Sequence, residues 1–559
     1  MNKDKRFIEE SFPVKEVSTE SAREKNIRHG HISTLHIWWA RKPLASSRAT
    51  NYAALIPAPE DIEEWQRERQ FIIELCKWEN SNNERLLERA RKRILKANGG
   101  EPPRVLDPFA GGGAIPLEAL RLGCETYAGD LNPVAVLIEK CTLEYPQKYG
   151  KKIPRKQYFS ERPWLPPSAK DDKKGELFGD DSTEMVNPLL EDVKYWGNWV
   201  MNEAKKEIGR FYPNDPDGSI PVGYYWMHTI PCQNPTCNSD IPLTVNWWLA
   251  KKKNKKVALY PFSGANVRSS LDKAADAGVS FKIVGNGYEE WPAGFNPENG
   301  SVSRAVATCP VCGSTVEADA TRRLFREGKA GQRLIAVVTH KPGTTGKKYR
   351  IAIEQDMAIF KEAEYYLQEK REQLMLEWGM DPVPDELLPP KESHRAVGSQ
   401  LPLYGFKVWG DLFNARQKLA LITFVEKVRQ AQQKMQEAGI EAHYARAVGS
   451  YLAVGIDNIT EKNNVINRWA NTKETIAGVF SRQALPMVWD YFESNMFSGS
   501  TGDWHNAIDY NLKVIILCTI NSSNSSVSNF SSTSLEHEEE FFHAVFTDPP
   551  YYDLSLIHI

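Results

Sequence analysis

The chain has 559 residues, a formal net charge of −2, and contains 41% hydrophobic and 25% charged residues. This length favours roughly two to four domains, and the near-neutral charge excludes a surface that is basic throughout, so any nucleic-acid contact must come from a local patch. No apolar run approaches a membrane span, the polar start lacks the pattern of a signal peptide, and the eight cysteines are not spaced like a secreted disulfide framework. We therefore expect a soluble, cytoplasmic protein without membrane association.

Residues 1–100 are expected to form a basic and helical N-terminal segment. Its most distinctive stretch, residues 36–44, reads HIWWARKPL. Pro43 suits the first turn of a helix, so we predict an Ala-rich helix over residues 44–56, and a charged helical hairpin follows over residues 61–100. The two tryptophans either pack on a sheet or belong to a lid over a cofactor.

Residues 104–133 predict the first half of a nucleotide-binding sheet. A short apolar strand ends at Asp107 and runs into three glycines, a helical pattern follows, and a second strand over residues 125–128 runs into Asp130. Strand, glycine turn, helix, strand and acid in this order form one half of a doubly wound sheet. In such a sheet the glycine turn and the helix N-terminus approach the ligand, and the acid binds ribose hydroxyls.

The ligand of this turn is open between NAD, another nucleotide and S-adenosylmethionine, and an ordinary structural turn is the alternative to all three. The glycine spacing fits G-x-G-x-x-G poorly and no G-K-[ST] follows, which disfavours a phosphate-binding P-loop. Asp107 at the mouth of the first strand suits a cationic ligand, such as a sulfonium with an α-amino group.

Residues 146–219 predict an extended connection that ends in a helix near residues 186–210. Residues 220–318 predict a separate unit with a metal site. Its two cysteine pairs are Cys232 with Cys237, and Cys309 with Cys312. The second pair stands in the sequence CPVCG, a typical zinc knuckle, and pairing with the first would complete a closed tetrahedral site for a structural zinc without a catalytic role. Four buried or free thiols are the alternative.

Between the cysteine pairs lies a run of five lysines: Lys251, Lys252, Lys253, Lys255 and Lys256. A lysine run is usually the solvated edge of a hairpin. Contact with nucleic-acid phosphates is the other interpretation.

The remaining chain predicts a mostly helical insertion and then the second half of the sheet. Residues 319–500 form the insertion, with helices expected over residues 351–378, 411–440, 450–458 and 476–491. Residues 501–553 are expected to hold a buried strand over 512–519, a Ser- and Asn-rich loop, and a strand over 543–547. The sheet is thus split between residues 101–145 and residues 501–553, and an insertion this large exceeds what a connecting loop needs.

The last strand runs into Asp548-Pro549-Pro550-Tyr551. Together, Asp-Pro-Phe-x-Gly-x-Gly at residues 107–113 and Asp-Pro-Pro-Tyr resemble the motifs of the amino-group DNA methyltransferases, which methylate an exocyclic nitrogen of adenine or cytosine. An aromatic amine is a poor nucleophile because its lone pair is delocalised into the ring. Asp548 and the Pro549 carbonyl would accept its two N–H hydrogens and so localise the lone pair, prolines would keep these acceptors rigid, and Tyr551 would stack on a flipped base.

Across nearly the whole chain, the sequence resembles a bacterial and archaeal family of zinc-ribbon-containing, adenine-specific DNA methylases. The resemblance implies a Rossmann-like, S-adenosylmethionine-dependent methyltransferase that acts on adenine N6 in DNA, with DNA and proteins of a restriction-modification or phage-defence system as partners. It implies the cofactor-binding residues Lys42, Pro43, Asp107, Phe109, Gly111, Gly113, Asp130 and Asn132, and the catalytic residues Asp548, Pro549, Pro550 and Tyr551. An insertion in this position commonly carries target recognition in amino-methyltransferases. Cytosine N4, an RNA amino group, and a non-catalytic nucleic-acid-binding subunit remain alternatives.

The end of the chain departs from this family. A methyltransferase sheet needs about three more strands after the catalytic loop, and only six residues follow Asp553. Residues 554–559, LSLIHI, also match the reading frame of a sequencing adapter. We therefore expect a truncated chain that lacks its C-terminal strands and ends in an adapter-derived tail, with a genuine short tail as the alternative; truncation would put the folding and activity of this chain in question.

Overall fold

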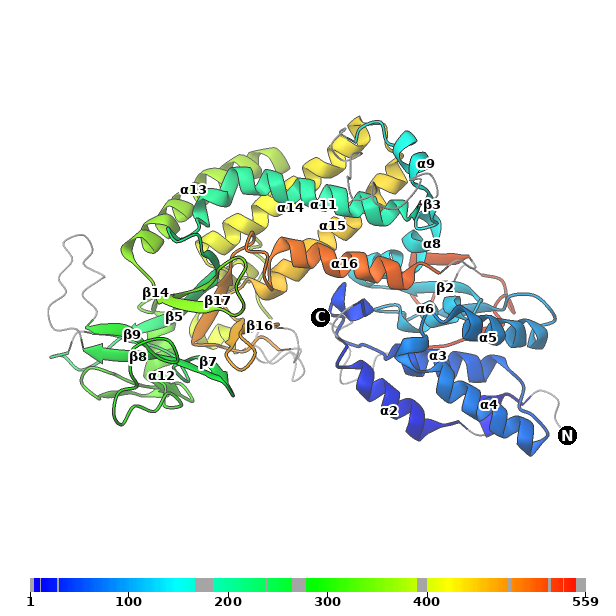
Figure 1. Ribbon diagram of the computed structural model, residues 1–559, viewed down its shortest axis with the longest axis horizontal. Coiled ribbons are helices and arrows are strands. Elements are labelled where there is room, and N and C mark those ends of the chain that lie inside the picture. The colour runs from blue at the N-terminus through cyan, green and yellow to red at the C-terminus, as the bar shows by residue number, and fades with distance from the viewer. Residues whose placement is uncertain are drawn as a thin grey trace. The chain divides into compact units, whose positions relative to one another are not determined.

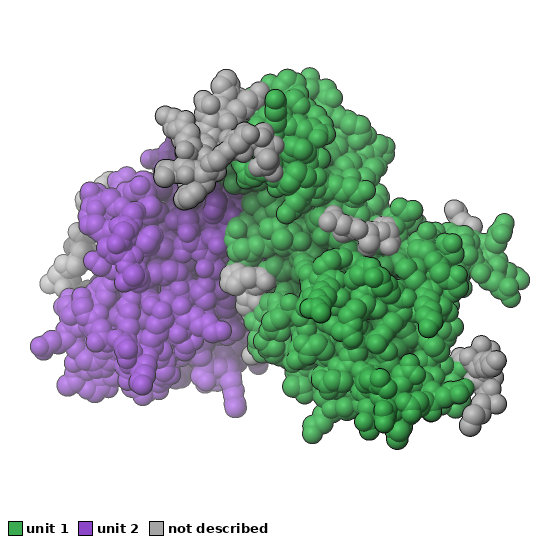
Figure 2. Space-filling model, turned by 45° about the vertical axis from the view of Figure 1, so that its right-hand side comes forward, with its two compact units in different colours: residues 1–199, 428–455, 508–559 green, residues 200–427, 456–507 purple. Residues whose placement is uncertain are grey.

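The computed structural model describes residues 5–10, 12–27, 30–165, 184–237, 239–263, 278–389, 400–479, 484–520, 524–535 and 537–548. The chain divides into two compact units, which Figure 2 distinguishes by colour. Unit 1 comprises residues 1–199, 428–455 and 508–559, and unit 2 comprises residues 200–427 and 456–507. Both units combine helices with sheets, so the fold class is mixed α/β, as predicted.

Unit 1 contains a parallel four-stranded sheet in the order β18-β2-β1-β19. Its strands are β1 (Arg104–Asp107), β2 (Glu125–Asp130), β18 (Ser525–Asn529) and β19 (Ala544–Val545). β1 lies between its two neighbours, with Val105 opposite Thr126 on β2 and opposite Ala544 on β19. Because the strands are parallel, their carboxyl ends meet at one edge, and ligands of open α/β sheets bind outside that edge.

Helices from the N-terminal segment pack with β1 in one apolar core (Figure 1). They are α1 (Phe7–Glu10), α2 (Val14–Glu24), α3 (Leu44–Leu55), α4 (Ile62–Leu75) and α5 (Glu84–Ala97), together with α6 (Ala114–Arg121), which joins β1 to β2. The predicted helix over 44–56 and the predicted hairpin over 61–100 are confirmed.

A buried charge cluster ties α3 to α6. Arg48 Nε lies 2.5 Å from a carboxylate oxygen of Glu118, and Arg121 Nε lies 3.3 Å from it. All three side chains are at most 1% exposed. Charges at this depth are tolerated only when they are paired and hydrogen-bonded, so this cluster fixes the helix that begins at the glycine turn against the N-terminal segment.

The other elements of unit 1 are short, apart from helices that continue across the division between the units. They are η1 (Ile32–Thr34), η2 (Trp78–Asn80), α7 (Pro133–Glu139), the π-helical turn η3 (Lys140–Glu144), α8 (Tyr145–Tyr149), β3 (Ile153–Pro154), α9 (Arg155–Ser160) and β4 (Met185–Val186). The division falls within α11 (Pro188–Ile208), α14 (Ala415–Glu437), α15 (Ala442–Lys462) and α16 (Trp504–Cys518).

The predicted strand over residues 512–519 is wrong, because this run belongs to helix α16. A short apolar run is equally compatible with a buried strand and a buried helix. The third strand of the sheet, β18, instead comes from the Ser- and Asn-rich sequence that was expected to be a loop. β18 stands at the edge of the described sheet and buries only Val527, so pairing with β2 rather than an apolar pattern holds it in place.

The described residues of unit 2 form four sheets. Antiparallel β14-β13-β5-β17, with β6 paired to β5, is the largest; the others are β7-β8-β9, β10-β11-β12 and β15-β16. Their strands are β5 (Ile220–Pro231), β6 (Asp240–Pro242), β7 (Trp248–Lys252), β8 (Lys255–Ser263), β9 (Val279–Gly285), β10 (Val302–Ser303), β11 (Val306–Thr308), β12 (Thr315–Val316), β13 (Gly331–His340), β14 (Lys348–Ile351), β15 (Arg468–Ala470), β16 (Thr475–Ala477) and β17 (Asp490–Ser494).

The helices that lie wholly in unit 2 are η5 (Gly209–Phe211), α12 (Ala318–Arg326), α13 (Glu354–Trp378), η6 (Leu401–Tyr404) and η7 (Trp409–Leu412). The long helices predicted over 351–378 and 411–440 are confirmed as α13 and α14. The helix predicted over 476–491 is wrong, because its described ends form parts of β16 and β17. The described part of the chain holds no helix with the length and apolarity needed to cross a bilayer.

Candidate functional site

Two acids stand at the carboxyl ends of β1 and β2, and the glycine turn connects them. The Gly111 N–H donates to Asp130 Oδ2 over 3.1 Å, and the Phe109 N–H donates to Asp107 Oδ1 over 3.1 Å. Gly113 has a φ of +75° and precedes the first residue of α6. A left-handed residue there is the conformation that glycine adopts at least cost, so the three-glycine sequence explains the local turn.

Asp130 is also tied to the start of α7 and to β18. The Asn132 N–H donates to Asp130 Oδ1 over 2.8 Å, and Asn132 Oδ1 accepts from the Val134 N–H to cap α7. The Asn529 side-chain amide donates to the Asp130 carbonyl over 2.8 Å. Asp130 is therefore held in one orientation at the sheet edge, where a ribose-binding acid is expected.

The pairing of β19 with β1 brings Asp548 to the same edge. The Phe546 N–H donates to the Leu106 carbonyl over 2.9 Å, so both strands leave the sheet in the same direction. Lys42 from the N-terminal segment forms an ion pair with Asp548. Lys42, the Asp107 turn and Asp548, which are far apart in sequence, thus meet at one place in unit 1.

The buried carboxyl of Asp107 is perturbed by its neighbours. The pKa of Asp107 is raised to about 7, mainly by burial and to a smaller extent by the negative charges of Asp130 and Asp548, whereas the hydrogen bond from the Phe109 N–H opposes the rise. Desolvation and like charges both disfavour an ionised carboxyl. Strongly perturbed acids of this kind gather at functional sites more often than elsewhere.

Aromatic side chains lie on the backbone of the site. The Trp38 indole packs on Gly111, where a Cβ would come within 2.6 Å of its Nε1, and it stacks on Trp39 with ring centroids 4.1 Å apart. Phe530, which follows β18, packs on Gly129, where a Cβ would come within 2.0 Å of its ring. Both glycines are therefore required by the close approach of an aromatic ring, and Gly111, with a φ of +54°, is also required by the turn.

One acid at this site was not predicted. Glu139, on α7, is fully buried, and neither of its carboxylate oxygens has a hydrogen-bond partner among the described residues. Burial raises its pKa to about 9, with further contributions from Asp130 and Asp107. The only signal in the sequence is a glutamate within the apolar helix pattern VAVLIEK, and such a signal does not show which way the side chain faces.

Most of the predicted site residues lie within the described part of the chain, and three lie outside it. Lys42, Pro43, Asp107, Phe109, Gly111, Gly113, Asp130, Asn132 and Asp548 all belong to unit 1. Pro43 is extended and stands just before α3, whose first residue is Leu44, so it precedes the helix. Pro549, Pro550 and Tyr551 lie outside the described residues.

The four predicted metal ligands come together in unit 2. The sulfurs of Cys232, Cys237, Cys309 and Cys312 all lie within 4.8 Å of one another. Cys232 Sγ is 3.6 Å from Cys312 Sγ, and Cys237 Sγ is 3.8 Å from Cys309 Sγ. Four sulfurs arranged tetrahedrally at about 2.3 Å from a zinc ion are separated by roughly 3.8 Å. The cluster could therefore hold a metal ion such as zinc.

Backbone contacts shape this cysteine cluster. The Cys232 N–H donates to the Ser239 carbonyl over 2.9 Å, and the Gly313 N–H donates to the Cys309 carbonyl over 2.9 Å. An apolar cluster that includes Ile241, Leu324 and Phe325 surrounds the sulfurs. Four cysteines would fill every position of a tetrahedral ion, so the geometry suits a structural role rather than a catalytic one.

The lysine run forms the β7–β8 hairpin, and three of its members are paired with acids. Lys251 lies 2.5 Å from Glu298, and Lys252 and Lys255 lie 2.5 and 2.6 Å from the two carboxylate oxygens of Glu474. Lys253 and Lys256 are exposed and have no carboxylate partner within the described ranges. Lys253 and Lys256 are therefore the lysines of the run that can pair with an external anion.

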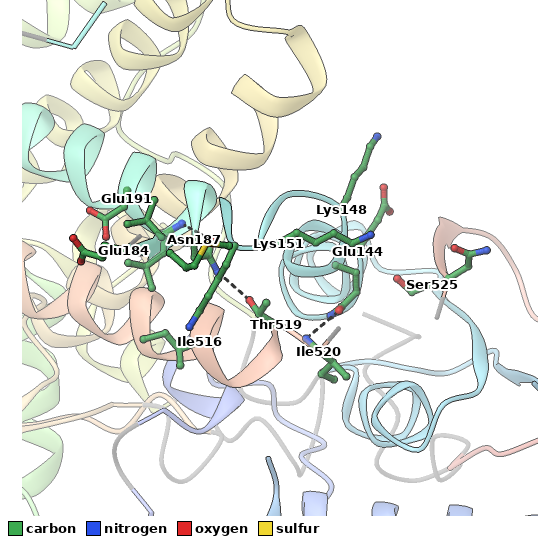
Figure 3. A pocket seen from close by; sticks show the side chains of 16 residues that line it. Glu144, Lys148, Lys151, Glu184, Asn187, Glu191, Ile516, Thr519, Ile520 and Ser525 are labelled. Atoms are coloured by element: carbon green, nitrogen blue, oxygen red, sulfur yellow. Dashed lines mark hydrogen bonds between the residues drawn. The ribbon is translucent and has the colours of Figure 1, made fainter. Parts of the chain in front are cut away.

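A groove of about 1370 Å³ lies elsewhere on unit 1 (Figure 3). Figure 3 shows Glu184 and Glu191 on the left side of the groove and Lys148 on the right side. The Asn187 side-chain amide donates a hydrogen bond to the Thr519 hydroxyl. The groove includes Ser525, which pairs with Thr126 near the amino end of β2. The groove therefore lies toward the end of the sheet opposite to Asp107 and Asp130 and contains none of the predicted cofactor-binding residues.

Comparison with known proteins adds one similarity. The family model of a protein of unknown function, DUF1156, matches residues 11–80. This range includes Trp38, Lys42 and the helices α2, α3 and α4. No curated protein and no solved structure matches the chain.

Proposed function

We propose that this chain is an S-adenosylmethionine-dependent methyltransferase that acts on the exocyclic amino group of adenine in DNA. The observation that carries the proposal is the parallel pairing of β1 with β19. This pairing puts the acid of Asp-Pro-Pro-Tyr beside the acid that opens the glycine turn, so that a methyl donor and a methyl acceptor would share one pocket.

The arrangement of the sheet supports a Rossmann-like methyltransferase fold. Numbered in chain order, its strands β1, β2, β18 and β19 are arranged 3-2-1-4. This is the first part of the doubly wound order 3-2-1-4-5-6, in which the ligand binds at the carboxyl edge near the first strand. The glycine turn and Asp130 stand at that edge.

The charge of the site favours a cationic ligand over a dinucleotide. Four acids gather here: the negative charges of Asp130 and Asp548 raise the pKa of Asp107, and those of Asp130 and Asp107 raise the pKa of Glu139. An anionic pyrophosphate would be repelled by these acids, whereas a ligand with a sulfonium and an ammonium group would relieve their mutual repulsion. We therefore assign the site to S-adenosylmethionine rather than to NAD.

Asp548 has the role of an acceptor for the target amine in this proposal. Its carboxylate is about one-third exposed and pairs with Lys42, which holds it at the pocket while leaving it open to a ligand. A fixed acceptor would withdraw an N–H hydrogen from conjugation and direct the nitrogen lone pair toward the methyl group without reorganising during the reaction. From the sequence, Pro549, Pro550 and Tyr551 are proposed to complete this acceptor loop and to stack on the flipped base.

Unit 2 is proposed to bind the nucleic acid. A structural zinc ion in the four-cysteine cluster would stabilise the strands that carry the cysteines. The exposed Lys253 and Lys256 on the β7–β8 hairpin would contact phosphates. A restriction-modification or phage-defence context follows from the sequence resemblance.

Two measurements on the purified chain test the proposed function. Titration calorimetry should show binding of S-adenosylmethionine but not of NAD. Incubation with isotope-labelled S-adenosylmethionine and duplex DNA, followed by mass spectrometry of the nucleosides, should give N6-methyladenine. N4-methylcytosine, or label transferred only to RNA, would change the substrate assignment. Absence of cofactor binding would favour a non-catalytic nucleic-acid-binding subunit.

A further inference from the structure

Within the described part of the chain, the carboxyl group of Glu139 is buried without a partner that would compensate for its loss of solvent. It is fully buried, and both carboxylate oxygens lack a hydrogen-bond partner among the described residues. Leaving a buried polar group unpaired costs stability, so each such group calls for an explanation. The hydroxyl of Thr142, which lies three residues further along, donates to the backbone carbonyls of Ile138 and Glu139 and not to the carboxylate.

The position of Glu139 links it to the glycine turn. Its Cγ lies 3.7 Å from where a Cβ on Gly113 would be, and the Thr142 hydroxyl lies 3.0 Å from the same point. The negative charges of Asp130 on β2 and Asp107 on β1 raise the pKa of Glu139. The α7 helix also passes into a π-helical turn immediately after Glu139, and π-turns are rare and occur frequently at functional sites.

Three basic side chains of the elements around the glycine turn are already paired with other acids. Lys42 pairs with Asp548, and Arg48 and Arg121 both pair with Glu118. Lys140, which follows Glu139 in the sequence, instead lines a separate cavity with Arg446. Within the described ranges, the protein therefore supplies no cation to Glu139.

We propose that Glu139 is a ligand-recognition residue that binds, together with Asp107, the α-ammonium group of the cofactor's amino-acid end. The inference rests on the proposed function, because it assigns one residue of that cofactor site. The free N–H groups at the start of α6 would take the carboxylate of the same amino-acid end, so the zwitterion would span the glycine turn. Asp130 would remain with the ribose hydroxyls.

The test compares three ligands by titration calorimetry at pH 7 with the full chain. S-adenosylmethionine has both a sulfonium and an ammonium group, S-adenosylhomocysteine has only the ammonium group, and methylthioadenosine has neither. Glu139→Gln should weaken binding of the first two at least tenfold and leave methylthioadenosine within twofold. Glu144→Gln, which removes a carboxylate from the same helical segment but from a side chain that lines another cavity, should bind all three like the wild type.

A second measurement needs no variant, so it holds even if Glu139→Gln does not fold. At pH 7 the ligand ammonium is mostly charged, whereas Glu139, Asp107 or both retain a proton. Binding of the cation should therefore release protons, seen as a dependence of the binding enthalpy on the ionisation enthalpy of the buffer. Methylthioadenosine should show no such dependence.

The outcomes separate the inference from the function on which it rests. Unchanged binding of all three ligands by Glu139→Gln, or binding without proton release, would overturn the role of Glu139 alone. Weaker binding of S-adenosylmethionine with unchanged binding of S-adenosylhomocysteine would place the carboxylate at the sulfonium and overturn the ammonium assignment. A wild-type chain that binds none of the three would reject the proposed function itself.

Discussion

At the scale of single residues, the acids at the carboxyl edge of the parallel sheet carry most of the functional argument. Asp107 and Asp130 stand where the sequence motif predicts them, because motif and strand end coincide there. Glu139 could not be predicted, because a single glutamate in an apolar helix pattern is equally compatible with a side chain that reaches solvent. Its role depends on a neighbour, Gly113, that lies on a different element.

Replacement of Asp548 with alanine should abolish methyl transfer and spare cofactor binding. Preorganised polar groups that act on the reacting atoms typically contribute on the order of 100- to 1,000-fold to the rate, so at least a 100-fold loss is expected in a radiolabel transfer assay. Glu101→Ala, at the exposed opposite end of β1, is the matched control and should keep its activity. Full transfer by the Asp548 variant would remove its proposed role.

The raised pKa of Glu139 predicts a pH dependence of stability. Folded Glu139 keeps its proton up to a pKa of about 9, whereas an unfolded glutamate releases it near its ordinary value. Unfolding therefore releases a proton, and the free energy of unfolding falls as pH rises from 5 to 8. Glu139→Gln lacks this contribution, so in the absence of ligand its melting temperature should rise relative to the wild type across that range. A constant difference between the two would contradict the raised pKa.

At the scale of elements, a helix or strand could be predicted where the turn residues and the hydrophobic period of its own sequence were distinctive. The glycine turn, α6 and β2 were predictable because turn chemistry and helix period agree over consecutive residues. The run LKVIILC could not be assigned, because most of its side chains are buried in α16 and buried helices and strands share the same apolar composition. β18 could not be predicted either, since its sequence SSVSN has little strand preference and depends on β2 for pairing.

The glycine turn should be sensitive to a single methyl group. In Gly113→Ala the new Cβ meets Thr142 Oγ1 at 3.0 Å and the residue keeps a φ of +75°, so the turn must shift and S-adenosylmethionine binding should weaken at least tenfold. Gly99→Ala isolates the backbone cost, because Gly99 has a φ of +70° and nothing lies within 4 Å of its added Cβ. It should lose about 1 to 2 kcal/mol of stability at most and bind the cofactor normally; equal loss of binding in both would contradict a local effect.

The four-cysteine cluster should lose its metal ion when one of its four cysteines is replaced. Cys309→Ser replaces a buried sulfur that stands 3.8 Å from Cys237 Sγ, and the zinc content measured by plasma mass spectrometry should fall together with the melting temperature. Cys76→Ser, a buried cysteine outside the cluster, should retain the metal. Unchanged metal content in the Cys309 variant would exclude the cluster as its site.

At the scale of the whole molecule, the chain separates its two proposed tasks between its units. Unit 1 holds the acids and the glycine turn, and unit 2 holds the cysteine cluster and the lysine hairpin. The pairing of the cysteines across the long gap was predictable from the knuckle sequence. The ion pairs of Lys252 and Lys255 could not be predicted, because their shared partner, Glu474, lies far along the chain.

Because Lys252 and Lys255 are paired with Glu474, we expect Lys253 and Lys256 to be the lysines of the run that bind nucleic acid. The double variant Lys253→Glu, Lys256→Glu should weaken duplex DNA binding in fluorescence anisotropy. It should also reduce the slope of log affinity against log salt by about 2, because each lost phosphate contact contributes roughly 0.9. Lys205→Glu, an exposed lysine on α11 of the same unit, is the control. A variant with unchanged slope would show that the hairpin makes no phosphate contact.

The pairing of β1 with β19 joins residues that are 439 positions apart, as the contact between Arg104 and His543 shows. Contacts between such distant residues form late and slowly, because a long loop must close first. During synthesis, the edge of β1 that receives β19 therefore stays unpaired until more than 400 further residues have been made. Neighbouring nascent chains could add a strand to that open edge. The yield of folded protein should therefore depend on the spacing of ribosomes along the messenger RNA and on chaperones that cover the edge during synthesis.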